Sequence, residues 1–132
     1  MQSVWEFKVR FGETDAAGIV YYPNFYKWMD QATHELFGSI NLSTRRMLSE
    51  KKGVPLLETF CQFKHPLQFE DEVKIVSTIV EVKNKTFKVL HTFYLGDIVS
   101  AEGYEVRVYV DSSSGTLKAV PIPDEIRSIL ES

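Results

Sequence analysis

The chain has 132 residues, of which 44% are hydrophobic and 25% charged, and this length favours a single domain (residues 1–132) with one sizeable core. Its formal net charge of −3 argues against nucleic acid or an anionic membrane as the main partner, because both bind basic surfaces, and no apolar run approaches the roughly 20 residues that cross a bilayer. A single cysteine, Cys61, can form no internal disulfide, so we expect a cytoplasmic protein.

The first predicted element is a strand over residues 4–11. Apolar and polar residues alternate there, which is typical of a strand with one buried face. The apolar members are Trp5, Phe7, Val9 and Phe11, and the polar ones are Glu6, Lys8 and Arg10. We therefore expect the apolar side chains to share one face of the strand.

A loop with one carboxylate, Asp15, follows this strand. Its neighbours Ala16, Ala17 and Gly18 are small. An aspartate in a turn before a helix most often hydrogen-bonds to local backbone atoms. A catalytic acid that faces the start of the helix is the alternative interpretation.

The strongest helical pattern begins at Pro23 and is expected to end near Gly38. Its apolar residues recur at steps of three and four and share one helix face; they are Phe25, Trp28, Met29, Ala32, Leu36 and Phe37. Pro23 suits the first turn, because its missing N–H would have no intrahelical partner there. The backbone N–H groups of Tyr21 and Tyr22 are then expected to stay unpaired near the positive end of the helix dipole.

The second half of the chain is predicted to be mainly β-structure. Ser43 is expected to cap a short helix that ends near residue 52. Four runs rich in β-branched and aromatic residues follow, at residues 56–69, 72–82, 86–95 and 98–110. Pro66 indicates a bulge or an edge in the first run, and tight connections between the other three predict an antiparallel meander.

A terminal helix is predicted over residues 123–130, where two acidic residues precede an apolar side. The order of one strand, one long apolar helix and four further strands predicts an α+β fold. In such a fold the antiparallel sheet wraps around one long central helix.

The loop and the start of the long helix also carry a specific string. Residues 11–25 read FGETDAAGIVYYPNF, which resembles the signature of the 4-hydroxybenzoyl-CoA thioesterase family of hotdog-fold enzymes. The resemblance covers most of the chain, from Trp5 to Ile122, and implies a hotdog fold. It also implies an acyl-CoA substrate, no cofactor beyond the coenzyme A of that substrate, and a homo-oligomer, a dimer or tetramer, with active sites at the dimer interface.

Thioester hydrolysis needs an attacking oxygen and a hydrogen-bond donor that stabilises the negative charge on the carbonyl oxygen. The family's catalytic carboxylate falls on Asp15, which would act as the nucleophile or as a general base toward water. Backbone N–H groups at a helix N-terminus can form an oxyanion hole, and we assign this role to Tyr22, with Tyr21 as a lesser candidate. Three further residues of the motif are assigned to substrate binding: Gly18, Ile19 and Val20.

Two residues favour an aromatic acyl group. Relatives that act on short aliphatic acyl groups commonly carry His at the position of Tyr22. Asp30 matches the helix acid that accepts the ring hydroxyl of the substrate in hydroxybenzoyl-type enzymes; a solvated helix acid is the alternative. If Asp30 lies in the pocket, a plain alkyl chain would leave its charge desolvated and unpaired, so a hydroxyaryl-CoA is preferred over a fatty acyl-CoA.

The remaining reactive side chains are expected to be structural. The three histidines, His34, His65 and His91, show no metal-ligand spacing, and Cys61 has no adjacent base. Basic residues available for the phosphates of coenzyme A, none of them assigned, are Arg45, Arg46, Lys51, Lys52, Lys83, Lys85, Lys88 and Arg107.

Two alternative functions stay open. One is a thioesterase for short aliphatic acyl-CoA or acyl carrier protein thioesters. The other is a non-catalytic module that binds an acyl ligand. Asp15 argues against the binding module, because a binder needs no carboxylate next to the carbonyl.

Overall fold

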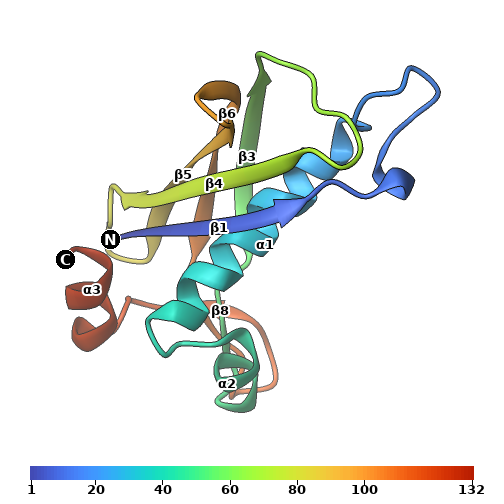
Figure 1. The fold of residues 1–132 in the computed structure, drawn as a ribbon. Coiled ribbons are helices and arrows are strands. Elements are labelled where there is room, and N and C mark those ends of the chain that lie inside the picture. Colours follow the sequence, from blue (N-terminus) through green and yellow to red (C-terminus); the bar gives the residue numbers. More distant parts are fainter.

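A five-stranded antiparallel sheet carries the longest helix, which has 17 residues, across one face (Figure 1). The structure is a computed structural model that describes residues 1–132. Its elements in chain order are β1 (Gln2–Lys8), the 3₁₀ turn η1 (Phe11–Glu13), α1 (Pro23–Ser39), α2 (Thr44–Ser49), β2 (Lys52–Gly53), β3 (Leu56–Phe63), β4 (Glu72–Val80), β5 (Thr86–Leu95), β6 (Ile98–Val108), β7 (Val110–Asp111), β8 (Lys118–Ala119) and α3 (Asp124–Leu130).

The strand order in the large sheet is β1-β4-β5-β6-β3, and every neighbouring pair is antiparallel. The predicted meander is confirmed as β4, β5 and β6, which are joined by short turns. β1 and β3 form the two edges of the sheet. A second, three-stranded sheet of β2, β7 and β8 was not predicted, because its strands have two residues each and show no alternation.

The apolar face of α1 is buried as the helical spacing predicts. All six predicted core residues of this helix have less than a twentieth of their surface exposed. Phe25, Trp28 and Met29 belong to one core cluster with the β1 end of the sheet, whereas Leu36 and Phe37 belong to a second cluster near α3. Buried polar side chains lie on α1 and the sheet as well, among them Thr33, His91 and Glu105.

The helix packs tightly against the sheet at Gly103 on β6. A Cβ atom at this position would lie 2.5 Å from the carbonyl oxygen of Phe60 and 2.6 Å from the sulfur of Met29. Only a residue without a side chain allows Met29 to pack at this depth. None of the helices could span a membrane.

Two predicted strand boundaries are wrong for local reasons, and one helix end differs in its detail. β1 ends at Lys8, and Phe11 lies in η1 with 74% of its surface exposed, because Glu13 turns the chain by accepting a hydrogen bond from the Arg10 amide (2.7 Å). α1 ends at Ser39, near Gly38 as predicted, but the residue with positive φ is Asn41 (63°) and not Gly38. β3 ends at Phe63, so that the proline at position 66 lies in the connection to β4.

The predicted cap of the second helix is confirmed. The Ser43 hydroxyl accepts a hydrogen bond from the Arg46 amide (3.2 Å) at the start of α2. The terminal helix is also present as α3, whose first turn holds Asp124 and Glu125.

Candidate active site

The Asp15 loop is a tight turn closed by its own backbone. The Asp15 amide donates to the carbonyl oxygen of Ile19 (2.9 Å), and the Gly18 amide donates to that of Asp15 (3.0 Å). Gly18 has φ of 80°, which a residue without a Cβ adopts freely. Thr14 and Val20 form a β-bridge at the base of the turn.

The Asp15 carboxylate takes part in this turn with one oxygen only. Its Oδ1 accepts a hydrogen bond from the Ala17 amide (2.9 Å), which is the local contact that an aspartate in a turn usually makes. Its Oδ2 accepts none, and the residue is exposed. The turn contact therefore orients the carboxylate and leaves one oxygen open to solvent.

The N-terminus of α1 presents one free amide next to this loop. Tyr22 caps the helix, Pro23 has no N–H, and the amides of Asn24 and Phe25 donate to the carbonyl oxygens of Tyr21 and Tyr22 (3.0 and 3.1 Å). The amide of Tyr22 donates to no acceptor in the protein. It thus has the position and the free hydrogen that an oxyanion-hole donor needs.

The Tyr21 amide does not stay unpaired as the sequence predicts. It donates to the carbonyl oxygen of Glu13 (2.9 Å), which also accepts from the side chain of Asn24 (2.9 Å). The lesser oxyanion candidate therefore already has a partner, and Tyr22 alone offers a free amide at this helix end.

A cavity of about 370 Å³ lies at this end of α1. Its lining is mostly apolar and consists of Ile19, Val20, Tyr22, Phe25, Phe63, Lys64, His65, Pro66 and Leu67. The cavity thus brings together three predicted site residues, Ile19, Val20 and Tyr22. Neither Asp15 nor Gly18 lines it. Phe63, at the end of β3, and His65, just after it, were not predicted to line a site, because nothing in their local sequence points to the helix.

Asp30 lies further along α1 and is paired with a buried cation. Its Oδ1 accepts a hydrogen bond from Nη2 of Arg107 (2.7 Å), and Nε2 of His34 lies 3.4 Å away. The Asp30 side chain is 54% exposed, whereas that of Arg107 is 3% exposed. The carboxylate is thus paired with Arg107 through Oδ1, and its role toward a substrate hydroxyl stays a prediction.

Arg107 belongs to a buried polar network that the sequence did not reveal. Glu105 accepts two hydrogen bonds from its guanidinium (3.2 and 2.7 Å) and one from Nε2 of His91 (3.1 Å). Burial alone would raise the pKa of Glu105, but the hydrogen bonds from His91 and Arg107 outweigh it and hold the pKa at about 2. Burial would lower the pKa of Arg107, yet the two carboxylates raise it.

One part of this network has the order of a hydrolytic triad. Nδ1 of His91 lies 2.7 Å from the Ser77 hydroxyl, and its Nε2 faces Glu105. All three residues are 1% exposed, so no substrate reaches the hydroxyl. We therefore interpret the arrangement as structural, as was expected for His91.

Other reactive residues are also explained by packing. Cys61 is buried, and burial raises the pKa of its thiol to about 12, which suits a small core residue. Arg107 cannot meet surface phosphates because it is buried. No group of three or more His, Cys, Asp or Glu side chains is placed to hold a metal ion.

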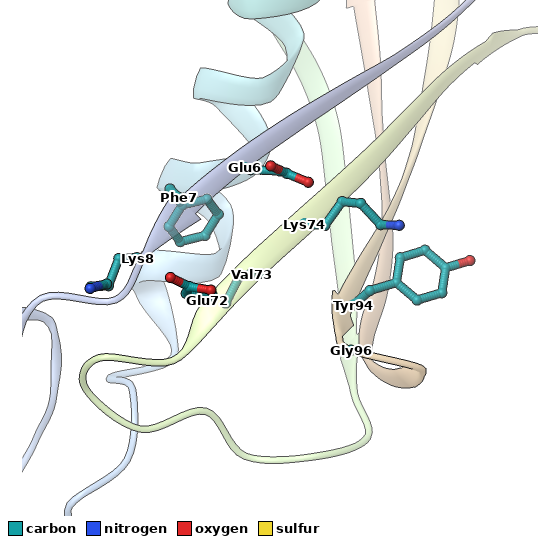
Figure 2. A pocket seen from close by; sticks show the side chains of 8 residues that line it. All are labelled: Glu6, Phe7, Lys8, Glu72, Val73, Lys74, Tyr94 and Gly96. Carbon is teal, nitrogen blue, oxygen red and sulfur yellow. The ribbon is translucent and has the colours of Figure 1, made fainter.

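A larger hollow of about 460 Å³ lies where β1, β4 and β5 meet (Figure 2). Its charged residues face opposite charges across the strands, Glu6 opposite Lys74 and Lys8 opposite Glu72. Nζ of Lys74 also lies 5.5 Å from the centre of the Tyr94 ring. Its charges are thus balanced among themselves, and no predicted site residue lines it.

Comparison with known proteins gives the chain a family. The model of the thioesterase-like superfamily matches residues 9–130. The chain is 44% identical to a gentisyl-coenzyme A thioesterase of known structure, with a TM-score of 0.88 over 95% of this chain and 99% of that one.

Two further relatives are named for hydroxylated aromatic thioesters. The 4-hydroxybenzoyl-CoA thioesterase of Pseudomonas sp. (strain CBS-3) is 27% identical over 124 residues, which are 88% of each chain. The 1,4-dihydroxy-2-naphthoyl-CoA hydrolase of Synechococcus sp. (strain CC9311) is 25% identical over 126 residues, which are 89% of this chain and 83% of that one. Since the family model covers nearly the whole sequence, the chain belongs to the thioesterase-like superfamily of hotdog-fold thioester hydrolases.

Proposed function

We propose that this protein hydrolyses a small aromatic acyl-CoA with a hydroxylated ring to the free acid and coenzyme A. One observation carries the proposal: the free amide of Tyr22 lies at an apolar cavity, and the exposed Asp15 carboxylate lies on the loop that leads into it. The three named relatives support the acyl class, because each is named for a hydroxylated aromatic thioester.

The carbonyl oxygen of the thioester would accept a hydrogen bond from the Tyr22 amide. Negative charge develops on this oxygen as the carbonyl is attacked, and the dipole of the 17-residue helix α1 favours it. A single donor of this kind is typically worth about 3 kcal/mol of transition-state stabilisation. Tyr22 thus supplies the electrophilic part of the reaction through its backbone.

Asp15 would supply the attacking oxygen through Oδ2, because Oδ1 is held by the Ala17 amide. As a nucleophile, Oδ2 bonds to the carbonyl carbon, the C–S bond breaks, coenzyme A leaves as the thiolate, and water then hydrolyses the mixed anhydride. As a general base, Asp15 takes a proton from the water that attacks. Both routes consume one water and need no cofactor beyond the coenzyme A of the substrate.

The cavity would hold the acyl group beside Ile19 and Val20. Its volume of about 370 Å³ lies within the range of roughly 300–1,000 Å³ found for small-molecule sites, and its apolar lining suits a ring. Gly18 contributes by allowing the turn that places these two residues. Asp30 does not line this cavity; its Oδ2, which accepts no hydrogen bond from the protein, would accept one from a ring hydroxyl that extends beyond the cavity.

A second copy of the chain would complete the site. β3 is an edge strand, and it exposes four large apolar side chains, Leu56, Leu57, Phe60 and Phe63. Unpaired edges of this kind favour pairing with another strand. Because Phe63 also lines the cavity, a dimer formed through β3 puts the active site at its interface. The proposal thus includes a homodimer, or a tetramer of two dimers, of single-domain subunits in the cytoplasm.

The test is the release of free thiol from a panel of thioesters. We expect faster cleavage of hydroxybenzoyl-CoA than of benzoyl-CoA, phenylacetyl-CoA or short and long aliphatic acyl-CoA. A preference for short aliphatic acyl-CoA or acyl carrier protein thioesters would overturn the aromatic assignment. Binding of acyl-CoA with no cleavage of any thioester would instead support a non-catalytic acyl-binding module.

A further inference from the structure

One side chain that lines the candidate cavity has no partner in the protein. His65 is half-buried at this cavity, and its imidazole makes no hydrogen bond and no ion pair; only its backbone is bonded. A neutral imidazole carries one N–H donor and one acceptor nitrogen. His65 therefore brings a donor to a mostly apolar cavity, and none of the steps described above uses it.

The backbone of His65 is fixed on both sides. Its amide donates to the carbonyl oxygen of Ser100 (3.0 Å), and its carbonyl oxygen accepts from the hydroxyl of the same residue (2.8 Å). Ser100 is fully buried on β6. Pro66 further restricts the conformation of the residue before it. The main chain thus holds His65 in place and leaves the imidazole available to a ligand.

Two contacts place His65 beside the N-terminus of α1. The Val20 amide donates to the carbonyl oxygen of Leu67 (2.8 Å). The rings of Tyr22 and Phe63 have their centres 6.4 Å apart. One segment rises in number from the first contact to the second while the other falls, so the two segments run in opposite directions. Because His65 lies midway between Phe63 and Leu67, it is level with the residues that lead into α1.

This end of the helix offers one backbone donor for an oxyanion. The Tyr22 amide is free, whereas the Tyr21 amide is bound to the carbonyl oxygen of Glu13 (2.9 Å). Oxyanion holes commonly combine two donors, and a histidine side chain is one of the groups that serve in this way. A second donor is therefore missing from the backbone, and His65 lies where it is needed.

We propose that His65 is a catalytic residue, whose imidazole N–H donates a second hydrogen bond to the thioester carbonyl oxygen beside that of the Tyr22 amide. This inference rests on the proposed function. When Asp15 or water attacks, one electron pair of the carbonyl moves onto its oxygen, and both donors stabilise the charge. The pair returns as the C–S bond breaks and the thiolate leaves. His65 gives up no proton in these steps.

The test uses two variants that separate the ring of His65 from its donor. His65→Gln keeps an N–H donor without the ring, and His65→Phe keeps a ring without the donor. We expect His65→Phe to lower kcat by roughly 100-fold with little change in KM, because the lost bond strengthens only in the transition state. We expect kcat of His65→Gln to stay within roughly tenfold of the wild type.

Gln68→Ala is the matched control. Gln68 is exposed in the same connection between β3 and β4, and it does not line the cavity. We expect this variant to have the kcat and KM of the wild type. If His65→Phe also matches the wild type, the inference is overturned. Activity in His65→Phe that is equal to or higher than that in His65→Gln contradicts it as well, since the ring and not the donor would then matter.

Infrared spectroscopy of the bound substrate gives a readout without turnover. A hydrogen bond to a carbonyl oxygen weakens the C=O bond and lowers its stretching frequency. The sample is isotope-labelled hydroxybenzoyl-CoA bound to Asp15→Asn, which we expect to cleave it slowly. Adding His65→Phe should raise the frequency, and adding Gln68→Ala should leave it unchanged. The same frequency with and without His65→Phe would refute the hydrogen bond.

A comparison of substrates separates the inference from the function on which it rests. A donor to the carbonyl oxygen acts on every acyl group, so His65→Phe should slow hydroxybenzoyl-CoA and benzoyl-CoA by the same factor. If only hydroxybenzoyl-CoA is slowed, His65 contacts the ring instead, the inference fails and the proposed function stands. If the wild type cleaves no thioester, both are refuted.

Discussion

Oε2 of Glu13 accepts a hydrogen bond from the indole N–H of Trp28, which follows it by 15 residues and lies at 3.2 Å. The other carboxylate oxygen accepts from the Arg10 amide, and the backbone carbonyl accepts from the Tyr21 amide. Glu13 thereby fastens the loop that carries Asp15 to the buried face of α1. The geometry between Asp15 and the helix N-terminus depends on this residue.

Removing the hydrogen bonds of the Glu13 carboxylate is expected to lower both stability and activity. Glu13→Ala loses two hydrogen bonds to a carboxylate, so we expect the free energy of unfolding to fall by about 2 kcal/mol and thiol release to slow. Glu13→Gln keeps one acceptor and is expected to lie between Glu13→Ala and the wild type. Glu35→Ala, at an exposed position on α1, is the control. If Glu13→Ala and Glu35→Ala have the same stability and the same rate of thiol release, Glu13 does not hold the loop in place.

Replacing Gly103 tests the packing of α1 on the sheet. A Cβ there overlaps a backbone carbonyl oxygen and the Met29 sulfur, so we expect Gly103→Ala to lower the free energy of unfolding by about 2 kcal/mol. Urea unfolding measures this difference. Gly12→Ala is the matched control, because a Cβ at position 12 would meet nothing within 4 Å. Equal stability of the two variants would contradict the close approach.

The buried carboxylate of Glu105 predicts a loss of stability in acid. Its pKa falls from the ordinary 4.5 to about 2 in the folded protein, so its stabilisation is present above about pH 4.5 and is lost as the pH falls toward 2. The difference corresponds to about 3 kcal/mol. We expect the free energy of unfolding to fall less steeply with acid in Glu105→Gln.

Glu102→Gln is the control for this pH dependence. Glu102 lies on the same strand but is half exposed and pairs with Lys64 at the surface (3.1 Å). We expect this variant to keep the acid dependence of the wild type. If Glu105→Gln and the wild type lose stability in parallel, the buried pair does not determine the acid response.

The exposed edge of β3 predicts an oligomer that a single charge disrupts. Leu57 is 62% exposed on this edge, and we expect Leu57→Lys to shift the protein toward monomers in analytical ultracentrifugation and to lower thiol release. Leu90→Lys introduces the same charge on the interior strand β5, at a residue that is 42% exposed. Dissociation by Leu90→Lys but not by Leu57→Lys would place the interface elsewhere.

Local patterns predicted the parts of the fold whose geometry is periodic. The helical spacing from Phe25 to Phe37, the cap at Ser43 and the alternation along β4 to β6 each depend on neighbours in sequence. The free amide of Tyr22 was predictable in the same way, because Pro23 marks the first helical position and the amide just before a helix has no intrahelical acceptor.

Contacts between residues far apart in the sequence could not be predicted from local patterns. Glu13 meets Trp28, and Arg107 meets Asp30 across 77 positions, so no local spacing shows either pair. In the sequence, Arg107 resembles any surface cation, whereas the fold buries it against α1. The strands β2, β7 and β8 are held by tertiary pairing, since two residues carry no alternation.

The most direct test of the proposed chemistry is the rate of thiol release by Asp15→Asn, measured with the hydroxybenzoyl-CoA that the wild type cleaves best. Asparagine keeps an oxygen that accepts from the Ala17 amide, so the turn and the melting temperature should be unchanged. Asp97→Asn, in the turn between β5 and β6, is the control. We predict that kcat of Asp15→Asn falls by roughly 100-fold or more while Asp97→Asn matches the wild type; wild-type kcat in Asp15→Asn would contradict the assignment of Asp15.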